Sequence, residues 1–335
     1  MSKSIQVFNG GGFENLKQVE RDVPKPRAGQ ILVKWHATSL NFHDYLIGVG
    51  GIKVGDGRIP MSDGAGEIME VGADVFDYQV GDHVMSMFFP AWQDGPPILT
   101  KLAGITGESL DGFLCEYSCL SANAVTRVPK GFSFAEAATL PTAPLTAWNA
   151  LMYTGHFKPG DKVLIEGTGG VSIFAMQMAL AMGAKVYATS SSPAKAERLK
   201  SMGVEAVVNY REEERWGKSI FKISDGGVDH VLDVGGGSTM NQSIEACKIG
   251  GHITAIGILS DGRKGSITFP KLFFKFITMR GIAVGNRAMQ HEMVAAIENT
   301  GIKPIIDKSF AFDEIVDAFK YQESGKHFGK IVVEW

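Results

Sequence analysis

Cysteine is scarce in this chain of 335 residues, which contains only Cys115, Cys119 and Cys247. A sparse and odd-numbered set of cysteines argues against a disulfide framework of the kind that stabilises small secreted proteins. It indicates a reducing compartment instead, so we expect a cytoplasmic protein.

Long apolar runs and an excess of charge are also missing. We find no run of about 18 apolar residues and no secretory signal peptide after Met1, so we expect no membrane anchor. The 33 Lys and Arg residues are balanced by 36 Asp and Glu residues, which gives a formal net charge of −3. This balance offers no electrostatic basis for binding nucleic acid or an anionic membrane.

The most informative pattern in the sequence lies at residues 162–192. An apolar run, Val163–Ile165, ends in a cluster of glycines, and a second apolar run covers residues 185–189. Between them lies an amphipathic helical pattern, whose apolar face includes Phe174 and Met178. This order is typical of a dinucleotide-binding fold, in which backbone N–H groups and a helix N-terminus hold a pyrophosphate. The residues that we expect at the cofactor are Gly167, Gly169, Gly170 and Val171.

The glycine fingerprint is imperfect, because Ser172 stands where its third glycine is expected. A tight strand–helix turn in any α/β protein is therefore the alternative interpretation. The strand before the turn, the helix after it and the second strand at the proper distance favour a dinucleotide site.

The end of the second apolar run indicates which dinucleotide binds. An NAD site usually has Asp or Glu there to accept the ribose 2′-hydroxyl, whereas this chain has Ser190, Ser191 and Ser192, and the nearest acid is Glu197. Hydroxyl groups, a helix N-terminus and Lys195 in the first turn would attract a 2′-phosphate, so we predict NADP(H). The alternative is that the serines only cap the helix, a role that suits Ser192 in either case.

The segments on either side of this stretch differ in pattern. Residues 1–125 contain short strand patterns separated by glycine and proline, which suggests a compact β domain. We expect residues 88–112 to form a long loop, whose aromatic residues Phe88, Phe89 and Trp92 either line a pocket or pin the loop to the core. After residue 162, strands alternate with helical patterns, which predicts a doubly wound parallel sheet.

Further motifs are spread along the whole chain, at Pro60–Gly72, Val80–Val84, Ala137–Pro141 with Leu145–Trp148, Lys158–Asp161 and His327–Val333. With these motifs the sequence resembles the medium-chain dehydrogenase/reductase superfamily, in particular its zinc-independent quinone oxidoreductase-like and alcohol dehydrogenase-like branch. The resemblance implies an α/β fold in which a Rossmann domain, residues 129–285, is inserted into a GroES-like, β-rich catalytic domain, residues 1–128 and 286–335. It also implies a homodimer paired through the last Rossmann strand, around Thr278–Val284.

The resemblance also indicates what this chain has lost. Zinc alcohol dehydrogenases of the superfamily have Cys, His and Cys at three catalytic ligand positions, and the matching residues here are Asn41, Ser62 and Thr142. Because Zn²⁺ prefers thiolate, imidazole or carboxylate ligands, we predict no catalytic metal. The four-cysteine structural lobe of the family would fall in residues 88–112, which contain no cysteine. His43 and Asp63 lie near the lost site, so a weak metal site is the alternative.

The candidate catalytic residues lie in the segment Asn41–Tyr45. By resemblance, Asn41 and Asp44 match positions near the cofactor, and His43 stands where alcohol dehydrogenases keep a Ser or Thr that contacts the substrate oxygen. An imidazole there could donate a proton near pH 7. The alternative is a loop histidine that faces solvent or holds backbone. Tyr45 is a second candidate donor, or a packing residue.

The resemblance places four more residues at the cofactor. Thr146 matches the threonine beside the nicotinamide, and Tyr210 matches a position near the 2′-phosphate. Backbone groups of Ile256 and Ile258, at the end of a Rossmann strand, could receive the carboxamide.

Without a metal, hydrogen-bond or proton donors must stabilise the oxyanion that develops during hydride transfer. This favours substrates that accept hydride readily. The leading prediction is therefore an NADPH-dependent oxidoreductase that reduces a quinone or an α,β-unsaturated carbonyl. A zinc-free alcohol/aldehyde dehydrogenase and a non-catalytic NADPH-binding redox sensor are the alternatives.

Overall fold

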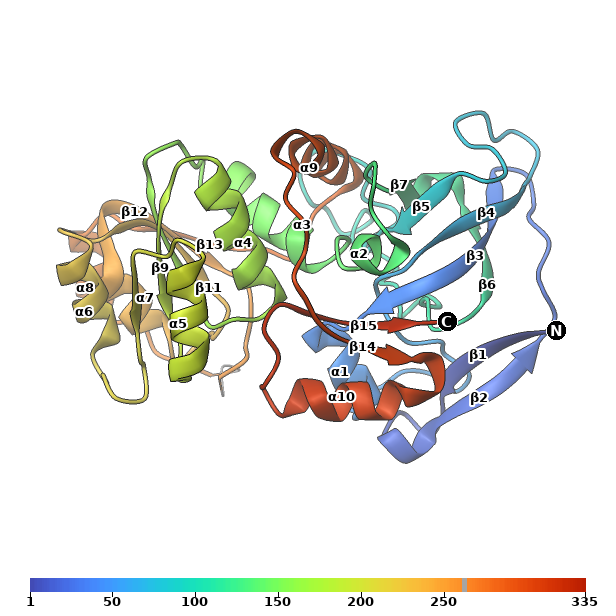
Figure 1. Cartoon of the computed structure of the whole chain (residues 1–335), viewed down its shortest axis with the longest axis horizontal. Coiled ribbons are helices and arrows are strands. Elements are labelled where there is room, and N and C mark those ends of the chain that lie inside the picture. The colour runs from blue at the N-terminus through green and yellow to red at the C-terminus, as the bar shows by residue number, and fades with distance from the viewer. Residues whose placement is uncertain (261–263) are drawn as a thin grey trace. The chain divides into compact units, whose positions relative to one another are not determined.

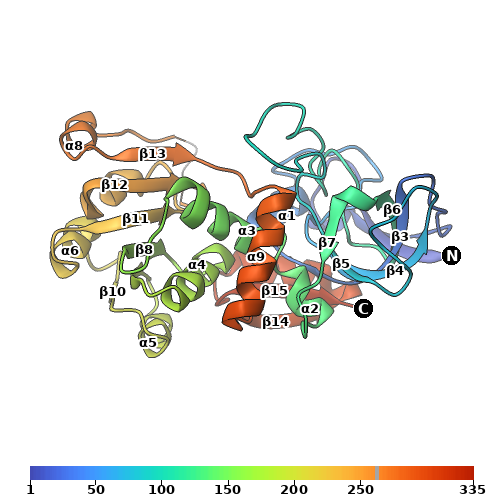
Figure 2. The same ribbon diagram turned by 90° about the horizontal axis from the view of Figure 1, so that it is seen from above.

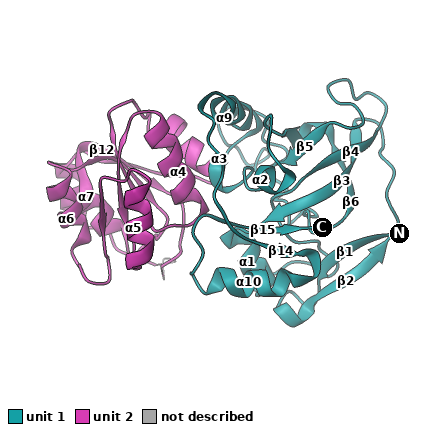
Figure 3. Cartoon of the chain, in the orientation of Figure 1, with its two compact units in different colours: residues 1–145, 285–335 teal, residues 146–284 magenta. Residues whose placement is uncertain are grey.

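The computed structural model describes residues 1–260 and 264–335. The chain divides into two compact units, residues 1–145 with 285–335 and residues 146–284 (Figure 3). Each unit has its own hydrophobic core and its own sheet. Among the described residues, none of the helices combines the length and the apolar character that crossing a membrane requires.

The first unit is built mainly of β-strands. Its seven-stranded sheet has the order β14-β15-β3-β4-β5-β7, with β6 paired to β3, and a separate hairpin joins β1 to β2 (Figure 1). The strands are β1 (Ser2–Val7), β2 (Leu16–Arg21), β3 (Gln30–Ser39), β4 (Ala65–Val71), β5 (His83–Ser86), β6 (Tyr117–Ser121), β7 (Val125–Arg127), β14 (Ile306–Ala311) and β15 (Lys330–Glu334). The helices are α1 (Phe42–Gly48), α2 (Phe134–Ala138), α3 (Ala143–Trp148, which runs into the second unit), α9 (Arg287–Thr300) and α10 (Ile315–Glu323).

The last strand brings the end of the chain back to its beginning. β15 pairs antiparallel with β3, with Val332 opposite Ser39, and parallel with β14. Buried apolar side chains along β15, including Ile331 and Val333, join the core formed around Trp35. This pairing sets the first residue of β15, Lys330, beside the junction of β3 and α1.

The second unit is a doubly wound parallel sheet with the order β10-β9-β8-β11-β12-β13, and Figure 2 shows its edge strands β10 and β13 with β8, β11 and β12 between them. Its strands are β8 (Lys162–Glu166), β9 (Lys185–Thr189), β10 (Ala206–Val208), β11 (Val228–Asp233), β12 (Cys247–Ala255) and β13 (Thr278–Gly281). Its helices are α4 (Gly170–Ala181), α5 (Pro193–Ser201), α6 (Trp216–Ile223), α7 (Met240–Ala246) and α8 (Phe269–Phe274), with a π-helical turn at Asn149–Thr154. The predicted fold class, a parallel Rossmann sheet inserted in a β-rich domain, is confirmed.

Two details differ from the sequence analysis. Residues 129–145, which we assigned to the Rossmann domain, lie in the first unit, because the buried alanines of α2 pack against β3 and β4. Helix α4 was expected to bury one face. In fact it is buried on most sides, since Ile173 and Met176 are as inaccessible as Phe174 and Met178.

Candidate functional site

The junction between β3 and α1 holds the first part of the candidate site. Asn41 precedes α1, and its backbone N–H donates to Asp44 Oδ2 at 3.0 Å, so the carboxylate satisfies a free donor at the start of the helix. The fully buried Asp44 also accepts bonds from the backbone N–H and the hydroxyl of Ser62, at 2.8 and 3.1 Å. These bonds fasten α1 to the segment before β4.

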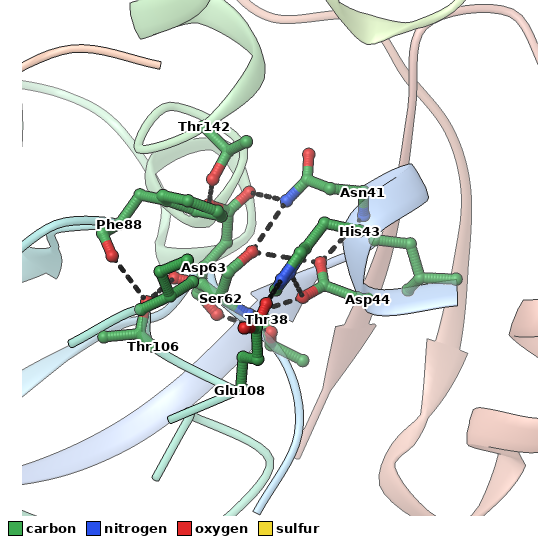
Figure 4. A network of polar contacts seen from close by, with 12 residues as sticks. Thr38, Asn41, His43, Asp44, Ser62, Asp63, Phe88, Thr106, Glu108 and Thr142 are labelled. Atoms are coloured by element: carbon green, nitrogen blue, oxygen red, sulfur yellow. Dashed lines mark hydrogen bonds and ion pairs between the residues drawn. The ribbon is translucent and has the colours of Figure 1, made fainter. Parts of the chain in front are cut away.

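Asp63 lies at the centre of this network and is fully buried (Figure 4). Its oxygens accept hydrogen bonds from Ser39 Oγ at 2.7 Å, Asn41 Nδ2 at 2.8 Å and Thr142 Oγ1 at 2.6 Å. Asn41 Nδ2 also lies 3.3 Å from Ser62 Oγ. The three positions that match the zinc ligands of the family, Asn41, Ser62 and Thr142, therefore do come together in space.

Lys330 supplies a cation to the same network. Its Nζ donates to Asn41 Oδ1 at 2.6 Å and to the carbonyl of Leu40 at 2.8 Å, and lies 3.4 Å from Asp63 Oδ2. Burial lowers the pKa of Lys330 and raises that of Asp63, while the mutual attraction of the two charges works against both shifts. Because Asp63 is surrounded by donors and has an ammonium beside it, a carboxylate, not a carboxylic acid, satisfies this arrangement. The hydrogen-bond donors around Asp63 therefore favour the ionised form of the pair.

The sequence analysis missed Lys330 as a site residue. The lysine lies 289 residues from Asn41, and only its place in the motif His327–Val333 drew attention to it. No local pattern could have indicated that its side chain turns into this network.

His43 forms the partly exposed side of the site. Its Nε2 lies 2.8 Å from Glu108 Oε2, in the loop between β5 and β6, and its Nδ1 lies 3.6 Å from Asp44 Oδ1. Burial alone would lower the pKa of His43, but Asp44 and Glu108 outweigh that effect and raise it. Phe88 from the same loop packs edge-on against the imidazole. Glu108 was not foreseen either.

Tyr45 points elsewhere. Its hydroxyl donates to Glu323 of α10 at 2.7 Å, and its ring packs near Phe13 and Phe42. Burial and the carboxylate of Glu323 raise the pKa of Tyr45 to about 12. The contacts of Tyr45 are therefore those of a packing residue that links α1 to α10.

The residues of this site do not fit a zinc ion. Asn41, Ser62 and Thr142 offer an amide and two hydroxyl groups, and an ammonium group lies against the amide oxygen. A second cation placed among them would be repelled by Lys330 and would find no thiolate or imidazole at these positions. Within residues 1–260 and 264–335, no group of three or more His, Cys, Asp or Glu side chains could hold a metal ion.

The glycine turn of the second unit is open where a ligand would approach. Gly167 has φ of +69°, and a Cβ added at Gly167 or Gly169 would meet no atom within 4 Å. Gly170 and Val171 begin α4 directly after this turn, so the N–H groups of its first residues are available. Ser172, at the position of the missing third glycine, is buried, and its hydroxyl donates to the carbonyl of Glu166 at 2.7 Å. The Ser172 hydroxyl therefore joins the start of α4 to the end of β8 on the buried side of the turn.

The end of β9 carries hydroxyl groups and no acid. Ser192 caps α5 by accepting a bond from the backbone N–H of Lys195 at 3.4 Å, as expected for a helix start. Ser191 Oγ accepts a bond from the hydroxyl of Tyr210 at 3.1 Å, and Ser190 is buried at the end of the strand. Ser190, Ser191, Lys195 and Tyr210 thus lie around one strand end.

Thr146, Ile256 and Ile258 are the remaining residues that we predicted to lie at the cofactor. Thr146 lies in α3 and is buried. Ile256 follows β12, and its backbone N–H donates to the carbonyl of Asp233 at 2.8 Å, whereas Ile258 is 41% exposed.

Comparisons with known proteins identify the family. Residues 27–130 match the alcohol dehydrogenase GroES-like domain family, and residues 170–299 match the zinc-binding dehydrogenase family. The chain is 41% identical over 332 residues to the zinc-type alcohol dehydrogenase-like protein C1773.06c of Schizosaccharomyces pombe, with 96% of each chain covered. It is 32% identical to 2-methylene-furan-3-one reductase of Solanum lycopersicum, covering 93% of this chain and 73% of that protein.

A solved structure agrees with this placement. The crystal structure of a Sinorhizobium meliloti protein classed as an alcohol dehydrogenase superposes with a TM-score of 0.92, at 37% identity, with 100% of both chains covered. The chain therefore belongs to the zinc-type alcohol dehydrogenase-like group of the medium-chain dehydrogenase/reductase superfamily, and is an oxidoreductase of that family.

Proposed function

We propose that this oxidoreductase transfers hydride from NADPH to an α,β-unsaturated carbonyl or a quinone without a catalytic zinc ion. The observation that carries this proposal is the Lys330 ammonium group, which lies 2.6 Å from Asn41 and 3.4 Å from Asp63. A fixed cation among the positions that match the zinc ligands leaves the site without a Lewis acid. Hydride acceptors that need no metal then suit it best. The similarity to a reductase whose named substrate is an enone supports the same class.

The second unit supplies the residues that would hold the cofactor. The open turn at Gly167–Gly170 and the start of α4 suit a pyrophosphate. Ser190, Ser191, Lys195 and Tyr210 suit a 2′-phosphate, because they offer donors and no carboxylate. Bound NADPH supplies the hydride. The fold and these side chains determine which dinucleotide binds and how it is oriented.

His43 supplies the proton in this proposal. When hydride adds to the β-carbon of an enone, the π pair of the C=C bond forms a new double bond to the carbonyl carbon, the π pair of the C=O bond moves to the oxygen, and the resulting enolate must take up one proton. The imidazolium of His43 donates that proton, because Asp44 and Glu108 stabilise its charged form. Glu108, with 31% of its side chain exposed, connects His43 to solvent for reprotonation. The hydroxyl groups of Ser62 and Thr142 donate to Asp44 and Asp63 and serve to hold the site together.

We also propose that the chain forms a cytoplasmic homodimer through β13. Among the described residues this strand is at the edge of its sheet, with β12 as its one neighbouring strand, and unpaired edges readily pair with another chain. Apolar side chains are exposed beside it, notably Ile249, Phe273, Phe274 and Phe276, with 57–75% of their surface accessible. Light scattering of Gly281→Pro should show monomers where the unaltered protein shows dimers, because the Ile282 N–H donates to Ala255 of β12 and the backbone N–H of the adjacent Gly281 therefore faces the free edge. An unchanged dimer would place the interface elsewhere.

The enzyme proposal is tested by measuring turnover of a panel of enones, quinones, aldehydes and alcohols with NADPH or NADP⁺. Reduction of enones or quinones, with no turnover of simple alcohols, is the expected result. Tight NADPH binding without turnover of any substrate would refute the proposed activity. His43→Ala should lower turnover of the best substrate by about 10²–10⁴-fold, and unchanged turnover would remove His43 as the proton donor.

The cofactor preference needs a separate measurement. Lys195→Ala should weaken NADPH about 10- to 100-fold, because it removes a charged donor, and should leave NADH nearly unaffected. Lys200→Ala, in the last turn of the same helix, is the matched control. Equal losses for the two dinucleotides would contradict the 2′-phosphate assignment.

A further inference from the structure

Two buried acids end neighbouring strands of the second unit. β8 ends at Glu166 and β11 at Asp233, and the two strands pair in parallel, with Ile165 opposite Leu232. Glu166 is 5% exposed and Asp233 is fully buried. Burial is the largest influence on both acids, followed at Glu166 by the Asp233 carboxylate and at Asp233 by backbone N–H groups and hydroxyls; within the described residues, no cationic side chain is among the principal influences. Two carboxylates in these surroundings would be strongly unfavourable.

One hydroxyl group connects the two acids. Ser243 Oγ, on α7, lies 2.8 Å from Glu166 Oε1 and 2.7 Å from Asp233 Oδ2. A hydroxyl has a single proton, and an ionised carboxyl group can only accept. If both acids were ionised, one carboxylate would face a lone pair of Ser243 at hydrogen-bond distance. One of the two acids must therefore carry a proton and donate it to Ser243.

The remaining hydrogen bonds favour negative charge on Asp233 and the proton on Glu166. Asp233 Oδ1 accepts from the backbone N–H of Gly236 and from the hydroxyl of Thr239, both at 2.8 Å. Glu166 Oε2 accepts a longer bond, 3.3 Å, from the backbone N–H of Gly235. The richer donor set stabilises negative charge on Asp233. Burial raises the pKa of both acids, and the Asp233 carboxylate adds to the effect at Glu166, whose pKa lies well above its ordinary value.

We propose that Glu166 is a neutral, protonated positioning residue. It donates to Ser243, which in turn donates to the Asp233 carboxylate, so that a directed chain of bonds joins the ends of β8 and β11. The glycine turn 167–170 follows Glu166 directly, and Gly235 and Gly236 follow β11. The proton leaves one negative charge at these strand ends where two would otherwise repel an anionic dinucleotide. Only this last consequence rests on the proposed function.

Replacing each acid by its amide tests the assignment, because an amide resembles a neutral acid and not a carboxylate. Glu166→Gln should keep the melting temperature within about 2 °C of the unaltered protein and the NADPH dissociation constant within about twofold. Asp233→Asn should lower the melting temperature by about 3–8 °C, because its amide N–H group would face the donors that now surround the carboxylate. Glu205→Gln, at an exposed position before β10, is the control. Equal losses for Glu166→Gln and Asp233→Asn would overturn the proposal.

Infrared spectroscopy at neutral pH gives a second readout that does not depend on stability or activity. The unaltered protein and Glu205→Gln should show the carbonyl stretch of a buried, protonated carboxyl group, and Glu166→Gln should lack it. Absence of the band from the unaltered protein, or its persistence in Glu166→Gln, would contradict the proposal. If the band behaves as expected but NADPH does not bind, the proposed function fails and the protonated pair stands.

Discussion

The two units bury negative charge in different ways. In the first unit, Asp63 accepts bonds from Ser39, Asn41 and Thr142 and has the ammonium group of Lys330 beside it. In the second, Glu166 and Asp233 share one hydroxyl, that of Ser243. A buried charge needs a counter-charge, sufficient donors, or a proton. Asp63 has the first two, whereas Glu166 has the third.

This difference concerns function as well as stability. The first site has the Lys330 ammonium group beside the Asp63 carboxylate, and we propose that this cation takes the place of a catalytic metal. The second site lies beneath a turn that suits an anionic ligand, and a proton removes one of its two negative charges.

Removing the cation of the first site should have the largest effect. Lys330→Met leaves the buried Asp63 carboxylate without its counter-charge, so we expect the free energy of unfolding to fall by about 3–5 kcal/mol. Denaturant unfolding measures this loss. Lys17→Met, at an exposed position on β2, should change stability by no more than about 0.5 kcal/mol.

A double variant tests whether the stability lost in Lys330→Met comes from the unpaired charge of Asp63 or from altered packing. Lys330→Met combined with Asp63→Asn removes both charges, and should recover a large part of the stability lost in Lys330→Met alone. Additive losses in the double variant would show that the two side chains do not form an ion pair.

Removing the Ser243 hydroxyl, which lies between Glu166 and Asp233, should have an intermediate effect. Ser243→Ala leaves Glu166 without an acceptor for its proton and Asp233 without one donor, so we expect a loss of about 1–3 kcal/mol in denaturant unfolding. Ser201→Ala, at the exposed end of α5, is the control. A loss no greater than that of the control would show that the hydroxyl does not join the two acids.

The sequence predicted local features better than distant contacts. The glycine turn at 167–170 was recognisable because strand, turn and helix are contiguous, and each has its own pattern. Lys330 and Asp63 are 267 residues apart, and only the pairing of β15 with β3 brings them together. Glu108 lies 65 residues from His43, in a loop without periodicity.

Glu166 lies within residues 162–192, the stretch that the sequence did identify, and yet its role could not be predicted. It precedes Gly167 directly, yet its partner Ser243 is 77 residues away, so the sequence offered no sign that it is protonated. Tyr45 shows the opposite error. Its position suggested a donor at the site, but a contact with Glu323, 278 residues away, engages its hydroxyl.

A smaller effect is expected in the pH dependence of stability, to which a protonated Glu166 should contribute. Glutamate in the unfolded chain loses its proton near pH 4.3, whereas folded Glu166 has a raised pKa and retains it. Above pH 4.3 the folded state therefore binds more protons than the unfolded state, and stability falls with rising pH by up to about 1.4 kcal/mol per pH unit until Glu166 ionises. Glu166→Gln should lack this slope. Parallel curves for the two proteins would contradict a retained proton.

The smallest effect is expected at the partly exposed pair of His43 and Glu108. Glu108→Gln removes one of the two carboxylates that raise the pKa of His43, so that pKa should decrease. NMR titration of the imidazole measures the shift, and the high-pH limb of the rate profile should move to lower pH with it. An unchanged titration would show that Glu108 does not act on His43.

The central claim is that Lys330 is the cation of the candidate site and that no catalytic zinc is held there. The most direct test is the metal content of the purified protein, measured by mass spectrometry together with NADPH-dependent turnover before and after treatment with a chelator. We expect far less than one zinc ion per chain and undiminished turnover after chelation. One tightly held zinc ion per chain, with turnover lost on its removal, would contradict it.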